Sequence, residues 1–152
     1  MKPLKGLFDR TDHVTLASLP DGLEALAIGD LARASGAKDG RPSLVAVARD
    51  GNRMAGLEAA LGFFAPDIQV MTFPAWDCLP YDRVSPTPEI VARRMATLSR
   101  LVRPQATTRP VVLLTTVNAI VQRVPERSMV AAETFAAAPG NRVDMADLVR
   151  WL

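Results

Sequence analysis

The chain has 152 residues, enough for one ordinary domain with a buried core, or for one domain and the start of a second. Hydrophobic residues make up 49% of the sequence and charged residues 22%, proportions that exclude a disordered tail or a coiled coil. Lys and Arg number 18 against 16 Asp and Glu, so the formal charge of +2 does not indicate a nucleic-acid-binding protein.

Cysteine content and hydropathy indicate the cellular compartment of the protein. Cys78 is the only cysteine, which excludes an internal disulfide and a cysteine-based metal site. The N-terminus lacks a secretory signal pattern, and the strongest apolar run, residues 110–121, is too short and too interrupted to cross a bilayer. We therefore expect a cytoplasmic protein with no membrane partner, and a monomer, because nothing in the sequence demands an oligomer.

The first predicted elements are a helix and a strand. Leucines and alanines recur at helical spacing over residues 23–34; Asp21 is expected to cap this helix and Gly36 to end it. Residues 43–48 form a continuous apolar run, which predicts a strand buried in the centre of a parallel sheet.

A second helix and strand follow, and then a long loop. Asp50 is expected to cap a helix that runs to about Phe64, and residues 68–72 predict the second strand. Prolines punctuate residues 73–88, which excludes a regular helix or a central strand there. We expect an ordered or functional loop.

The third helix is predicted from Thr87 as its cap, with Pro88 at its first position, to Pro104. Its periodic face is expected to consist of Ile90, Val91, Arg94, Met95, Leu98, Leu101 and Val102. Residues 111–117 predict a third buried strand, and Asn118 is expected to cap a short helical turn that reaches Arg123. This alternation predicts an α/β fold, a parallel sheet with helices on both faces.

The pattern changes after Pro125. Residues 129–135 are interpreted as an extended segment, residues 139–141 as a turn and residues 144–152 as the beginning of a helix. We expect one domain over residues 1–125 and the truncated beginning of a second over residues 126–152.

The sequence indicates no catalytic, cofactor or metal site. Residues 18–25 stand where an α/β domain would hold a phosphate loop, but they lack its lysine, and Asp21 and Glu24 would repel a triphosphate. His13 is the only histidine, and the carboxylates show no metal-ligand spacing. We interpret residues 18–25 as a helix cap, and expect the chain to be neither an enzyme nor a binder of a cofactor.

A row of arginines allows two interpretations. Its members are Arg93, Arg94, Arg100, Arg103 and Arg109. A basic helix face is more often a solvated surface than a phosphate-binding surface, and we favour the solvated surface here.

Two motifs carry a family resemblance. Residues 73–86 combine Phe73, Pro74, Trp76, Leu79, Pro80, Tyr81, Asp82, Ser85 and Pro86, and a helix with Arg94 follows them. This segment resembles the F-P-x-W-x-x-L-P-Y-D-x-x-S-P motif of bacterial transcription-repair coupling factors. Residues 117–125, with Asn118, Gln122 and Arg123, are similar to the same family's V-N-x-hydrophobic-x-Q-R-hydrophobic-P segment.

The resemblance implies a fold. The family's N-terminal region is similar to excinuclease B, a helicase-like protein of excision repair, but has a degenerate phosphate loop. Excinuclease B also holds a DNA-gripping hairpin at the comparable position. Here only Thr87 and Pro88 separate Pro86 from Glu89, so the resemblance implies that this hairpin is absent.

The resemblance also implies a function. The family comprises large ATP-driven DNA translocases that displace stalled RNA polymerase and recruit the excision-repair protein excinuclease A. ATP, Mg²⁺, RNA polymerase and double-stranded DNA are expected at other domains, and the contacts with excinuclease A mainly at the second N-terminal domain. The alternative is a domain that binds nucleotide or DNA and acts on ATP or DNA directly.

The loop residues can also be interpreted without a partner. Trp76 and Tyr81 are large rigid groups that anchor long loops as well as interfaces, and we favour packing within the loop over a binding hot spot. Arg123 is expected to hold the loop or a neighbouring domain through Asp82 or Asp77.

Overall fold

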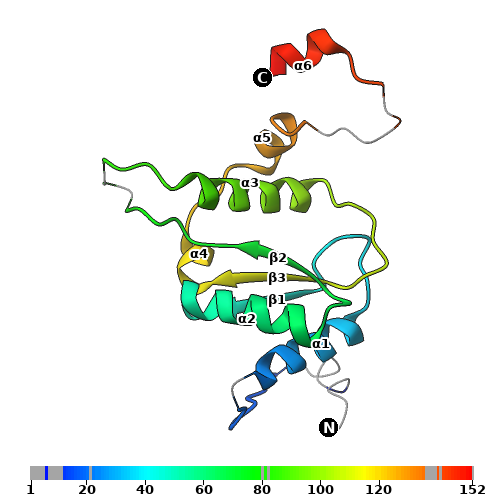
Figure 1. The fold of residues 1–152 in the computed structure, drawn as a ribbon, viewed down its shortest axis with the longest axis vertical. Coiled ribbons are helices and arrows are strands. Elements are labelled where there is room, and N and C mark those ends of the chain that lie inside the picture. Colours follow the sequence, from blue (N-terminus) through cyan, green and yellow to red (C-terminus); the bar gives the residue numbers. More distant parts are fainter. Residues whose placement is uncertain are drawn as a thin grey trace.

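The computed structural model describes residues 6, 12–20, 22–79, 81, 83–135, 140 and 142–151. Three parallel strands form a sheet with helices on both faces (Figure 1), which confirms the predicted α/β class. In chain order the elements are α1 Leu23–Ser35, β1 Leu44–Ala48, α2 Gly51–Phe64, β2 Gln69–Phe73, α3 Pro88–Val102, β3 Val111–Thr116, α4 Val117–Val121, α5 Arg127–Ala132 and α6 Met145–Trp151.

The strand order is β1-β3-β2, so β3 is central and β1 is an edge strand. The prediction that residues 43–48 form a central strand was therefore wrong. Ala46 and Ala48 are buried on one face of β1, whereas Val45 and Val47 are 54% and 49% exposed on the other. A short apolar run does not reveal whether its two faces are covered, because coverage depends on distant helices.

Two apolar clusters lie on opposite faces of the sheet. α1 and α2 cover one face, where Leu57 and Leu61 pack with Val112 and Leu114 of β3. On the other face Phe73 and Leu98 pack with Ala119 of α4 and Val130 of α5. The sheet is thus the middle layer of three, with α1 and α2 on one side and α3 on the other (Figure 1).

The local signals around α1 and α2 explain where they begin and end. Asp50 caps α2 as predicted, since its Oδ1 accepts a hydrogen bond from the Arg53 N–H at 2.8 Å. Gly36 ends α1, also as predicted, with a positive φ of 71° that favours glycine. The Asp21 cap lies outside the described residues.

The caps of α3 and α4 differ from expectation. Thr87 precedes α3 with Pro88 at its first turn, but the Thr87 side chain makes no capping hydrogen bond. α4 is capped by Thr116, whose Oγ1 accepts from the Ala119 N–H at 3.2 Å, and not by Asn118. Because Thr116 ends β3 in an extended conformation, its hydroxyl already stands where a cap is needed.

The buried face of α3 also differs from the predicted row. Arg94, Thr97 and Leu98 are buried there, whereas Met95 is 39% exposed. Thr97 joins this face because its Oγ1 donates to the Thr72 carbonyl at 2.6 Å. Hydrophobic spacing alone does not reveal such a partner.

The segment after Pro125 is helical where an extended segment was expected. α5 spans Arg127–Ala132, and its Val130 packs into the cluster beside α3. Val130 packs against residues that are distant in sequence, so the local sequence does not predict this helix. α6 confirms the predicted helix near residues 144–152, and Trp151 lies 5.5 Å from Phe135 between ring centroids. A domain boundary near residue 126 stays a prediction.

None of the helices in the described ranges combines the length and the hydropathy that a membrane span requires.

Candidate functional site

Arg94 lies at the centre of the residues that the two motifs contribute. It is carried by α3 and is only 1% exposed. Its guanidinium lies between the rings of Phe73 and Trp76, with Cζ 4.1 Å and 4.2 Å from the two ring centroids. Stacking on two aromatic faces stabilises a cation that has left water.

Hydrogen bonds at Arg94 connect the first motif to the second. Arg94 Nη1 donates to the Pro74 carbonyl at 2.6 Å and to Gln122 Oε1 at 3.1 Å. The same Gln122 oxygen accepts from the Trp76 backbone N–H at 3.0 Å. Residues 46 positions apart in the sequence are thereby joined through one side-chain amide. We call Phe73, Pro74, Trp76, Arg94 and Gln122 the motif junction.

The charge of Arg94 has no carboxylate partner among the residues described. Its Nε is buried without a hydrogen bond, and burial holds the pKa of the guanidinium below its ordinary value. An arginine still remains protonated at neutral pH. The motif junction therefore compensates a buried cation with two aromatic rings and two oxygen acceptors.

The long loop is closed at its base by Asp77. Both carboxylate oxygens accept from the Thr87 backbone N–H, at 3.2 Å and 3.3 Å. Hydrogen bonding from Thr87 holds the pKa of Asp77 below its usual range. Arg123 makes no ion pair with Asp77 and is exposed, contrary to one of the two contacts expected for it. The other partner, Asp82, lies outside the described residues, as does Pro80.

The remaining motif residues are not part of the motif junction. Leu79 is 68% and Tyr81 97% exposed, so Tyr81 does not pack within the loop as Trp76 does. Ser85 is exposed, Pro86 is half-buried and Asn118 is exposed.

A pocket of about 670 Å³ lies between the two motifs. It is lined by Trp76, Cys78, Tyr81, Val121, Gln122 and Arg123. Cys78 and Val121 were not predicted as site residues from the sequence. Nothing in the local sequence indicated either of them as a pocket residue.

A second pocket, of about 520 Å³, lies at the carboxyl ends of the three strands. In α/β folds this edge of the sheet is where ligands commonly bind. Its charged side chains are already engaged: Asp50 caps α2, Asp77 binds Thr87, and Arg93 pairs with Glu58 and Glu89. No group of residues able to hold a metal ion occurs in the described ranges.

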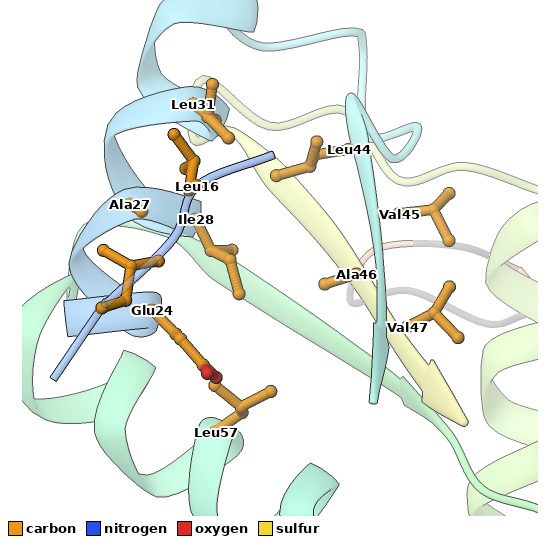
Figure 2. Close-up of a pocket in the computed structure, with 11 residues that line it drawn as sticks. Leu16, Glu24, Ala27, Ile28, Leu31, Leu44, Val45, Ala46, Val47 and Leu57 are labelled. Atoms are coloured by element: carbon orange, nitrogen blue, oxygen red, sulfur yellow. The ribbon is translucent and has the colours of Figure 1, made fainter. Parts of the chain in front are cut away.

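A third pocket, of about 320 Å³, lies between α1 and β1 (Figure 2), and its lining includes Leu19 and Glu24 of the segment that stands at the position of a phosphate loop. Leucine, isoleucine, valine and alanine side chains form almost all of its lining. Its one acid, Glu24, pairs with Arg53 at 2.6 Å. A lining of this kind suits apolar groups and offers no donor to a phosphate.

Most of the arginines in this row form ion pairs or hydrogen bonds with other residues of the protein. Arg93 pairs with acids, Arg94 is buried, and Arg103 Nη2 donates to the Ala131 carbonyl at 2.8 Å. Arg109 donates to the carbonyls of Pro66, Asp67 and Ile68. Arg100 has a buried Nε without a partner in the described part of the protein. These contacts agree neither with a fully solvated surface nor with a continuous phosphate-binding one.

Compared with protein-family models and with curated proteins, the chain shows no match.

Proposed function

We propose that the chain is the non-catalytic N-terminal module of a bacterial transcription-repair coupling factor. In this proposal residues 1–125 form a degenerate helicase-like domain, and residues 126–152 begin the domain that recruits the excision-repair protein excinuclease A. ATP hydrolysis, DNA translocation and displacement of stalled RNA polymerase are assigned to other domains of the longer protein.

The motif junction is the observation that carries the proposal. The two sequence segments that resemble this family meet through Gln122, which accepts from both Arg94 and Trp76. Residues that are diagnostic in two separate segments are expected to be in contact when they share one role. A buried arginine held between two rings gives these residues a structural reason to occur together.

The alternative, direct action on ATP or DNA, receives less support. The pocket beside α1 is apolar, and Glu24 at its edge is paired with Arg53. The arginines considered for DNA contact include one that is buried and one that pairs with two acids. Neither arrangement provides the free cations that phosphates require.

Calorimetric titration with purified excinuclease A tests the proposal. The chain and a form extended through the next domain are each titrated, with ATP and Mg²⁺ and with duplex DNA as parallel ligands. Binding of excinuclease A to either form, without binding of ATP or DNA to the chain, is expected. Binding of ATP or DNA to the chain would support the alternative, and no excinuclease A binding to either form would contradict the partner assignment.

A further inference from the structure

We propose that the pocket between the two motifs binds an acidic segment of a protein partner that carries a large apolar side chain. The inference rests on the proposed role as a module that serves protein partners, and it names the chemistry of the segment recognised. The apolar side chain would enter between Trp76, Tyr81 and Val121, and a neighbouring carboxylate would pair with Arg123.

The apolar surface beside this pocket is not explained by the chain's own packing. Within α4 only Ala119 is buried, whereas Val117, Ile120 and Val121 are 53%, 55% and 78% exposed. Val124, just beyond the helix, is 51% exposed. Scattered exposed apolar residues are ordinary, but several on one short segment beside a pocket indicate an interaction surface.

Two of the residues that line the pocket, Trp76 and Gln122, are held in place before a partner arrives. Trp76 is stacked on Arg94, and its backbone N–H is bound to Gln122. Gln122 is fixed in turn by Arg94. Side chains that are already fixed lose little conformational entropy on binding, so this part of the pocket favours recognition of a short segment.

Charge determines the chemistry of the segment. Arg123 lines the pocket, is exposed, and forms no ion pair or hydrogen bond with any residue described. A pocket of aromatic and apolar side chains beside a guanidinium that has no partner among the described residues is typical of a protein-binding hot spot. A nucleic acid would need several free cations along the same surface, whereas a carboxylate needs one.

Three short peptides of matched length test the inference by fluorescence anisotropy and by amide shifts in NMR. One has a Leu-Phe pair flanked by Asp and Glu, a second replaces the acids by Asn and Gln, and a third replaces Leu-Phe by Ala-Ala. We expect the acidic, apolar peptide to bind about five-fold more tightly than either control and to shift the amides of Val121, Gln122 and Arg123.

Two variants locate the site. Arg123→Glu should abolish the preference for the acidic peptide, whereas Arg41→Glu, the same charge change on an exposed residue in a different loop, should leave it intact. Equal binding of all three peptides, or equal effects of the two variants, would overturn the inference.

Titration of excinuclease A against the same variants separates the two proposals. A peptide preference without excinuclease A binding would support the pocket and contradict only the partner assignment. Excinuclease A binding with no peptide preference would contradict only the pocket.

Discussion

The two faces of the sheet are built differently. Under α1 and α2, the buried cluster is entirely apolar, with Leu61 and Leu114 fully inaccessible. On the face of α3, a buried arginine lies beside the apolar cluster, and Val45 and Val47 of β1 remain half exposed. We therefore expect the α1/α2 face to contribute most of the stability, whereas the α3 face leaves the apolar side chains of Val45 and Val47 exposed for contact with other molecules.

The largest expected effect is on the α1/α2 face. Leu61→Ala removes a fully buried side chain and leaves a cavity, so the free energy of unfolding should fall by about 2–5 kcal/mol. Val47→Ala, on the exposed side of β1, is the matched control and should cost under about 1 kcal/mol. Urea denaturation measures both, and equal losses would contradict the difference between the faces.

The next effect is at the motif junction. Arg94→Met leaves the Pro74 carbonyl and Gln122 Oε1 with fewer donors, but it also removes a buried charge. We expect a loss of about 1–3 kcal/mol, together with a changed Trp76 fluorescence spectrum. Arg94→Lys should not restore the wild-type spectrum, because an ammonium cannot stack as a plane between two rings. Full restoration by lysine would show that only charge matters.

A smaller effect is expected at the exposed edge strand. Val45→Thr with Val47→Thr keeps β-branched side chains on β1 while making its exposed face polar. Stability should change by less than about 1 kcal/mol, and solubility should rise, as measured by light scattering. A large loss of stability would show that these valines are covered in the free protein.

The smallest expected effect is a pH dependence in the α1/α2 layer. Hydrogen bonding from Arg33, at 2.7 Å and 2.8 Å, lowers the pKa of Asp67 to about 2. Since this pKa lies below the ordinary value of 3.8, the stabilisation is present above about pH 4 and is lost as the pH falls toward 2. Asp67 is 53% exposed, so solvent screening keeps the gain below about 1 kcal/mol. Asp67→Asn should flatten this part of an acid-unfolding curve, and an unchanged curve would contradict the assignment.

Local signals predicted much of the fold. The Asp50 cap, the Gly36 terminus and the alternation of strands and helices all depend on residues close in sequence, and each was confirmed. The errors at β1 and α5 have another origin. Whether Val45 is covered, or whether Val130 finds a partner, is decided by elements far along the chain.

The candidate site was predictable as a set of residues but not as an arrangement. The motifs named Trp76, Arg94 and Gln122, yet no spacing rule indicates that one amide oxygen joins them. The arginine row shows the same limit, because Arg94 and Arg109 look alike in sequence while one is buried and the other binds turn carbonyls. Contacts between distant segments settle such roles.

A double-mutant cycle on Arg94 and Gln122 tests most directly whether the two motifs form one unit. Arg94→Met, Gln122→Met and the double variant are compared by urea unfolding. A coupling energy of about 1 kcal/mol or more is predicted, because each side chain loses its partner when the other is removed. Additive losses would contradict the account and would mean that the motifs fold as independent segments.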